Sequence, residues 1–157
     1  MNSPVVSNQV NKSFQIDVRR VVERLKKGRV GKHIEDIMHT EEVQNYFTEN
    51  LINWSKERAQ KMSASTKQQF QELTSPELLW KNLSVNLSVN IFNNALAGWF
   101  EEVDKDFDDV IIDFVTVDMV KMVIDALRQT FEIMASQLQG RVIPFQPSRG
   151  GNSPFVN

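Results

Sequence analysis

The chain has 157 residues, with 18 lysines and arginines against 20 acidic residues, and carries a formal charge of −2 at pH 7. This length predicts a single domain that buries enough surface to fold without a metal or a disulfide. The sequence has no cysteine and only two histidines. That excludes disulfides, thiolate metal sites and cysteine nucleophiles, and it leaves little for a histidine-based centre. We therefore expect no metal and no cofactor.

Targeting signals are not evident in the sequence. The first residues, MNSPVVSNQVNKS, lack a basic segment followed by an apolar one, so they do not form a secretory signal. No apolar run is longer than three residues, whereas a membrane-spanning helix needs about 20. We expect a cytoplasmic protein without a membrane span.

Helical signals dominate the N-terminal half. Residues 1–12 are polar and aperiodic, which predicts a flexible tail. Ser13 is placed to cap a first helix that ends at Gly28, because glycine takes a positive φ without steric cost. A short helix over about 30–38 follows, then a helix capped by Thr40 that runs to about Met62, and a short one over 67–73. Their apolar residues recur every three or four positions: Phe14, Val18, Val21, Leu25, Val30, Ile34, Ile37, Met38, Val43, Phe47, Leu51 and Trp54.

The segment after Ser75-Pro76-Glu77 admits two readings. This tripeptide is a helix start, with a serine cap, a proline in the first turn and an acid at the positive end of the helix dipole. Over 83–91 apolar and polar residues alternate, which is typical of a strand. Asparagines also recur every four residues from 82 to 94, which would give a helix a polar face and place Ser84 and Ser88 on its apolar face. We favour a helix, because helical signals flank the segment on both sides.

The last helix has the strongest pattern in the chain. Residues 106–115 permit a short helix or a strand, and Thr116 is placed to cap a helix that ends at Gly140. Its seam has the 3-4 spacing of a coiled coil, and whether it packs within the chain or between chains stays open. The seam residues are Val117, Val120, Ile124, Leu127, Phe131, Met134 and Leu138. A second apolar strip lies to one side, and we predict that its residues Met119, Met122 and Ile133 form an oligomer contact.

Residues 140–157 differ from the rest in composition. They hold three of the five prolines and three of the six glycines, so they cannot continue the helix and lack the apolar density of a fold. Phe145 and Phe155 each follow a proline. We predict a tail in which these two phenylalanines are docking anchors, with a tail that only packs back on the domain as the alternative.

Charge is unevenly distributed along the chain. Residues 101–118 contain eight acids against Lys105, whereas residues 19–33 contain seven basic residues against Glu23. Two solvated faces would explain both runs. Alternatively, the basic arm binds nucleic acid or an acidic partner, or it meets the acidic segment of another copy. The basic arm comprises Arg19, Arg20, Arg24, Lys26, Lys27, Arg29 and Lys32.

Few motifs in the chain carry chemistry. Gly28-Arg29-Val30-Gly31 resembles the G-x-x-G loop of the KH nucleic-acid-binding family, which implies basic loop residues beside phosphates. A KH domain also needs strands, whereas residues 40–62 are predicted to be helical. The acids at 104, 106 and 108 have calcium-loop spacing, but Asp109 stands where that loop requires glycine. Nucleophile elbows, dinucleotide fingerprints and H-E-x-x-H motifs do not occur.

These patterns predict an all-α, single-domain bundle of four to six helices over residues 13–139, with a short β element at 83–91 or 110–115 left open. We expect no catalytic residue and no enzyme activity. The favoured function is a protein-interaction or assembly protein that forms homo-oligomers and engages partners through the basic arm and the C-terminal tail. The alternative is a nucleic-acid-binding regulator or packaging protein that uses the same arm. A small-ligand sensor built on core methionines and aromatics is a third, weaker candidate.

Overall fold

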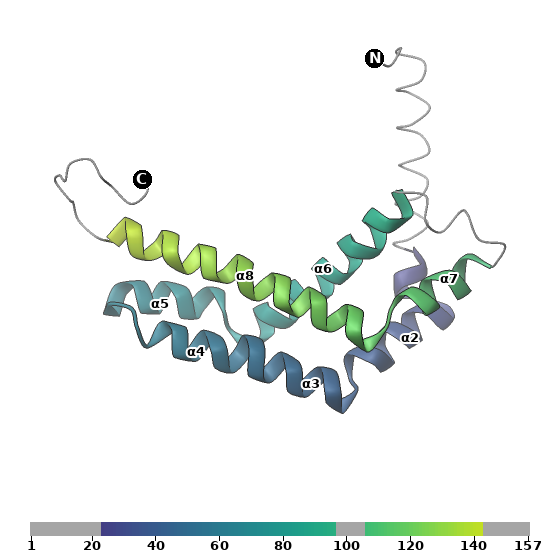
Figure 1. Cartoon of the computed structure of the whole chain (residues 1–157), viewed down its shortest axis with the longest axis horizontal. Coiled ribbons are helices and arrows are strands. Elements are labelled where there is room, and N and C mark those ends of the chain that lie inside the picture. Colours follow the sequence, from purple (N-terminus) through teal and green to yellow (C-terminus); the bar gives the residue numbers. More distant parts are fainter. Residues whose placement is uncertain (1–22, 97–105, 143–157) are drawn as a thin grey trace, which may run out of the picture. The chain divides into compact units, whose positions relative to one another are not determined.

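A computed structural model describes residues 23–96 and 106–142 of the chain (Figure 1). These residues form helices and no strand, which confirms the all-α prediction. A helical segment at 23–26 precedes the helices, whose bounds are as follows: α2 Gly28–Met38, α3 Glu41–Phe47, α4 Trp54–Ala59, α5 Ala64–Leu73, α6 Pro76–Leu96, α7 Phe107–Phe114 and α8 Val117–Val142. A π-helical stretch, η1 (Thr48–Asn53), joins α3 to α4 without a break.

Three helix starts are capped by the residues that the sequence indicates. The Val43 amide donates to Thr40 Oγ1 over 3.3 Å at the start of α3. The Leu78 amide donates to Ser75 Oγ over 3.3 Å before α6. The Met119 amide donates to Thr116 Oγ1 over 3.1 Å before α8. Each hydroxyl satisfies one of the backbone donors that a helix leaves unpaired in its first turn.

Both segments left open between helix and strand are helical, at 83–91 within α6 and at 107–114 in α7. Three element ends differ from the prediction: α4 ends at Ala59 rather than at about Met62, α5 begins at Ala64 rather than at 67, and α8 continues past Gly140 to Val142. A glycine lowers helix stability but does not prevent a helix from continuing for another residue or two.

The buried side of α6 differs from the predicted one. A stripe at every fourth residue is buried, consisting of Leu79, Leu83, Leu87, Ile91 and Ala95. Ser84 is exposed, and the Ser88 hydroxyl donates to its carbonyl, so the prediction that these serines lie on the apolar face is wrong. The helix carries more apolar residues than one stripe can bury, which leaves Val85 and Val89 on the surface.

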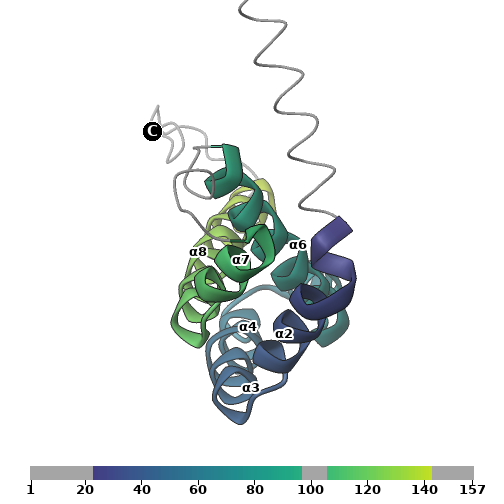
Figure 2. The same ribbon diagram turned by 90° about the vertical axis from the view of Figure 1, so that its right-hand side faces the viewer.

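The chain divides into two compact units, which are described separately. In the first, residues 23–44, 84–96 and 106–123, α2 packs against α7 (Figures 1 and 2). Val30 of α2 and Ile111 of α7 are fully buried there, and Val115 after α7 almost so. The His33 ring places Nε2 2.8 Å from the Val115 carbonyl, so Nε2 carries the donated proton.

The second unit comprises residues 45–83 and 124–142, in which α4, α5 and the C-terminal part of α8 lie side by side (Figure 1). Its core joins all three helices through Ala59, Phe70, Ala135 and Leu138, with Trp54, Met62 and Met134 packed against them. The Trp54 and Phe70 rings meet edge-on, with centroids 6.3 Å apart. Phe47 meets Trp80, near the start of α6, in the same way at 5.1 Å.

Candidate functional site

The described part of the basic arm lies around the corner between the 23–26 helical segment and α2. Arg24 and Lys26 belong to the first, Lys27 is the extended residue at the corner, and Arg29 and Lys32 are in α2. Arg19 and Arg20 lie outside the described residues.

Two arginines of the arm bind acidic residues of the same chain. Arg29 spans two carboxylates at the start of α7, with Nη1 2.7 Å from Asp109 Oδ1 and Nη2 2.9 Å from Asp106 Oδ2. Arg24 Nε lies 2.8 Å from Asp108 Oδ1. We call these five residues the α2–α7 ion cluster. The basic and acidic segments of the sequence therefore meet within one chain.

The environment differs between the two arginines. Arg29 and its partners are more than half exposed, and the hydrogen bond and charge of Asp109 raise the pKa of Arg29 above its ordinary value. The Asp108 side chain is only 20% exposed. Its Oδ1 is buried and accepts no hydrogen bond, so the attraction of Arg24 is ionic rather than a directed bond. A buried charge of this kind is costly without its ionic partner.

The lysines of the arm are arranged differently. Lys32 pairs with Asp36 one turn further along α2, over 3.2 Å. Lys26 and Lys27 are exposed and form no ion pair among the described residues. Within the described part of the arm, Lys26 and Lys27 are therefore the cations that an outside partner could contact without breaking an ion pair of the chain.

The G-x-x-G stretch is the first turn of α2 rather than a loop. Gly28 has φ +62°, and the Gly31 amide donates to the Lys27 carbonyl over 3.1 Å. A Cβ at Gly31 would lie 3.0 Å from the carbonyl carbon of Lys26. Both glycines are explained by the sharp corner, with positive φ at one and close backbone approach at the other.

The predicted oligomer strip of α8 is only partly at the surface. Met122 is 70% exposed and Ile133 is 60% exposed, whereas Met119 is buried, so placing Met119 on a contact strip is wrong. Near the start of α8, Met119 and Val123 are buried in addition to the seam residues, so the buried face is wider there than the seam. The seam itself is covered by the chain's own helices, with Val117 and Met134 half-buried and the other members buried.

A row of polar contacts joins the α3–α4 run to α8 in the second unit. Tyr46 donates to Asp125 Oδ1 over 2.7 Å, and Arg128 donates to Asn50 Oδ1 over 3.1 Å. Arg58 donates to both Glu132 oxygens over 2.9 and 3.1 Å, and to Gln139 Oε1 over 2.7 Å. Residue numbers rise together on both sides, so the two helical runs are parallel. We call these contacts the polar row.

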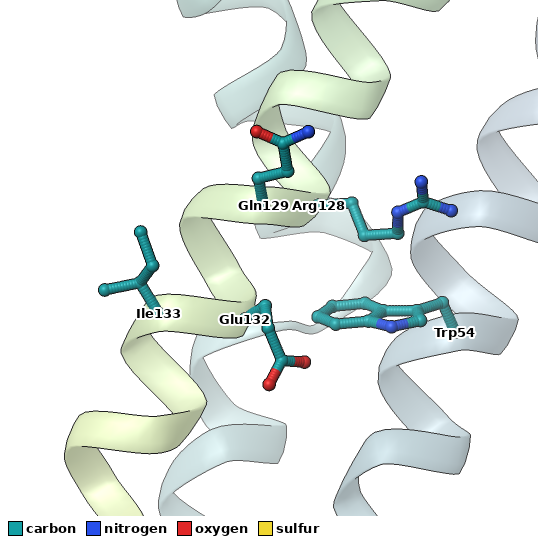
Figure 3. A pocket seen from close by; sticks show the side chains of 5 residues that line it. All are labelled: Trp54, Arg128, Gln129, Glu132 and Ile133. Atoms are coloured by element: carbon teal, nitrogen blue, oxygen red, sulfur yellow. The ribbon is translucent and has the colours of Figure 1, made fainter. Parts of the chain in front are cut away.

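Trp54 lies between Asn50 and Arg58 on the same helical face, since positions 46, 50, 54 and 58 follow one another at four-residue intervals. Its indole reaches from α4 toward α8, with Arg128 above the ring and Glu132 beside its edge (Figure 3). A hollow of about 360 Å³ opens here, lined mainly by apolar surface of Trp54, Arg128, Gln129, Glu132 and Ile133. Ile133 projects from α8 on the side away from the indole, whereas the Gln129 side chain points along α8, toward the top of the view (Figure 3). We call this pocket the Trp54 hollow.

The apolar spacing of the 40–62 helix predicts Trp54 on its inward face and gives no local sign of the hollow. The indole is in fact only half-buried, although it packs against the core cluster. One available signal was the spacing of Tyr46, Asn50, Trp54 and Arg58, which puts three large amphipathic side chains and an amide on one helical face. The predicted anchors Phe145 and Phe155 lie outside the described residues.

No three His, Asp or Glu side chains in the described ranges are grouped so that they could hold a metal ion. None of the helices within 23–96 and 106–142 is long and apolar enough to cross a membrane. Comparison of the chain with protein-family models, with curated proteins and with solved structures found no match.

Proposed function

We propose that this chain is a non-enzymatic protein-interaction protein that self-associates, with the Trp54 hollow as its docking surface. The observation that carries the proposal is Ile133, which is 60% exposed on α8 and lines an apolar hollow beside a half-buried indole. Exposed apolar side chains at the edge of a pocket are typical of surfaces that receive a partner's side chain.

The second unit holds this docking surface in a fixed shape. Trp54 is held edge-on against Phe70, and the helices on either side are joined by Arg58–Glu132 and Arg128–Asn50. Because this docking surface is already ordered before binding, little further conformational entropy is lost when a partner docks. Gln129 and Glu132 supply polar groups at the margin, which suits an interface with an apolar centre and a polar rim.

Replacing Ile133 with glutamate tests the proposal directly. The charge would be desolvated in the interface, so we expect Ile133→Glu to give a single chain of 18.1 kDa, while the wild type sediments as a larger species. Gln137→Glu is the matched control, because Gln137 is exposed one turn further along α8 and receives the same charge. Sedimentation velocity over a concentration series measures the mass. A wild type and an Ile133→Glu variant of equal mass would refute self-association through this surface.

Nucleic-acid binding is the second candidate, favoured by the exposed Lys26 and Lys27. If it holds, Lys26→Glu with Lys27→Glu abolishes binding, because two phosphate contacts are lost and two repulsive charges appear. Lys56→Glu with Lys61→Glu, at exposed positions of the second unit, is the charge-matched control. Fluorescence anisotropy with a labelled oligonucleotide at two salt concentrations measures both pairs. Equal affinities for the two double variants would exclude the arm as the site.

A further inference from the structure

Arg29 is held by its own chain in the manner in which an arginine holds a phosphate. Each of its two terminal nitrogens contacts a different carboxylate, with Nη1 2.7 Å from Asp109 Oδ1 and Nη2 2.9 Å from Asp106 Oδ2. A guanidinium binds a phosphate through the same forked donors, which match two of the phosphate oxygens. The two aspartates therefore occupy the positions that phosphate oxygens would take on Arg29.

Asp106 forgoes a local contact in order to reach Arg29. It is the N-cap residue of α7, but its side chain forms no capping hydrogen bond. An aspartate at this position ordinarily accepts a hydrogen bond from a backbone amide of the first turn. Its Oδ2 instead accepts from Arg29, which lies 77 residues away in the sequence. The start of α7 is thus arranged around the arginine of α2 rather than around its own backbone.

The Arg29 contacts are open to exchange with solvent ions, whereas the neighbouring ion pair of the cluster is not. Arg29, Asp106 and Asp109 are 56, 61 and 52% exposed, and ion pairs at such positions contribute little to stability. Arg24 pairs with Asp108, which is only 20% exposed. An outside anion can therefore replace the carboxylates on Arg29 while the Arg24 pair keeps α7 against the arm.

Two further cations lie beside Arg29. Lys26 and Lys27 are exposed and lie within three residues of it, so the Cα atoms of the three residues span at most about 11 Å. A nucleic-acid backbone carries a phosphate at every nucleotide and contacts several cations at once, and each contact adds affinity by releasing counterions. A single small anion meets only one of these cations at a time. The corner therefore suits a chain of phosphates better than an isolated one.

We infer that Arg29 is a phosphate-binding residue of the basic arm, and that Asp106 and Asp109 mask it in the free chain, so that nucleic-acid phosphates must compete with them. The acidic start of α7 is then a built-in competitor that lowers the affinity of the arm. This inference rests on the nucleic-acid candidate and is independent of self-association through the Trp54 hollow.

Removing the two masking charges tests the inference in the full chain. Asp106→Asn with Asp109→Asn should tighten binding of a fluorescein-labelled single-stranded oligodeoxynucleotide about three- to tenfold, because Arg29 is released from two exposed ion pairs. Asparagine caps a helix as well as aspartate does, so α7 keeps its start, and circular dichroism checks the helix content. Glu35→Gln with Glu41→Gln is the matched control, since it removes the same charge from exposed positions of the first unit. The control pair should change the Kd much less.

The gain in affinity must depend on Arg29 itself. Arg29→Gln should change the Kd little in the wild-type chain, whereas in the Asp106→Asn, Asp109→Asn background it should remove the whole gain. Between about 50 and 200 mM salt, the slope of log K against log salt should be steeper by about 0.7 in the unmasked variant, which corresponds to one more phosphate contact on a single strand. Charge that acts only at a distance would make the effect of Arg29→Gln equal in both backgrounds, and that result overturns the inference.

Failure of the inference and failure of the nucleic-acid candidate give different results. Wild-type binding that is lost in Lys26→Glu with Lys27→Glu, but is not tightened by the two asparagines, overturns the mask and upholds the arm. Binding that appears only in the asparagine variant, and there depends on Arg29, upholds the mask and refutes nucleic-acid binding by the wild-type chain. If no variant binds, or if inorganic phosphate at the same phosphate concentration displaces the oligonucleotide, nucleic acid is not the ligand and the inference is overturned.

Discussion

At the scale of single residues, Gly28 and Gly31 show how the G-x-x-G pattern is used. Gly28 has φ +62°, and nothing lies within 4 Å of a Cβ built there. Its requirement for glycine is therefore conformational. Gly31 is in an ordinary helical turn, but a Cβ there would lie 3.0 Å from the Lys26 backbone. Its requirement is one of space. Neither explanation involves a phosphate, although the pattern resembles a nucleic-acid-binding loop.

Substitution at Gly28 should follow backbone preference rather than side-chain size. Gly28→Ala should lower the free energy of unfolding by about 1 kcal/mol, because an L-residue pays roughly that much in the left-handed region. Gly28→Asn should cost less, since asparagine tolerates this region better than alanine does. Urea unfolding of the two variants measures the difference. If asparagine proves at least as costly as alanine, the corner does not depend on the positive φ of Gly28.

At the scale of elements, the ion pairs of the α2–α7 ion cluster should differ in strength: Arg24 joins the 23–26 segment to α7, and Arg29 joins α2 to α7. In double-mutant cycles, the coupling of Arg24 with Asp108 should exceed that of Arg29 with Asp109. Asp108 is largely buried, whereas the Arg29 pair is solvated and screened. Raising salt from 0.1 to 1 M should weaken the Arg29 pair more. Larger coupling for the exposed pair would contradict this assignment.

The raised pKa of Arg29 determines how the Arg29–Asp109 coupling depends on pH. Asp109 raises the pKa of Arg29, and a base whose folded pKa is raised keeps its full contribution at every pH below its unfolded pKa. That contribution fades only as the pH rises beyond the ordinary arginine range. The Arg29–Asp109 coupling should therefore be equal at pH 7 and pH 10 in the same cycles. A loss of coupling by pH 10 would contradict the charge state assigned to Arg29.

Among the helices, local sequence patterns predict where helices begin better than which side chains are buried. Helix starts at Thr40, Ser75 and Thr116 were predictable because a capping hydroxyl acts on amides two or three residues away. The burial of Met119 and the exposure of Val85 were not, because they depend on which helices pack alongside. The attraction between the basic and acidic segments was visible in composition. Their pairing within one chain was not, because charge complementarity does not say which copy supplies the partner.

The candidate site was less predictable than the fold. Ile133 was expected at the surface and is there, because its helical position falls outside the heptad seam. The Trp54 hollow arises where two parallel helical runs are joined above and below by Asn50–Arg128 and Arg58–Glu132. That arrangement brings together residues more than 70 positions apart, and no local pattern specifies it.

At the scale of the whole molecule, two kinds of surface could drive association, and they respond oppositely to salt. Charged segments attract other copies or polyanions at low ionic strength, and this attraction is largely screened at 1 M salt, where the Debye length is about 3 Å. Arg24 and Arg29 are already paired within the chain, which reduces what the basic arm offers. Apolar docking at the Trp54 hollow is not screened. Association through the hollow should therefore survive high salt.

The most direct test of this account is sedimentation equilibrium of the full chain at 0.1 and 1 M sodium chloride, comparing wild type, Ile133→Glu and Gln137→Glu. The account predicts that wild type and Gln137→Glu associate at both salt concentrations, and that Ile133→Glu remains a single chain at both. Wild-type association that disappears at 1 M salt, together with an Ile133→Glu variant that still associates at 0.1 M, would contradict the account and assign assembly to the charged segments.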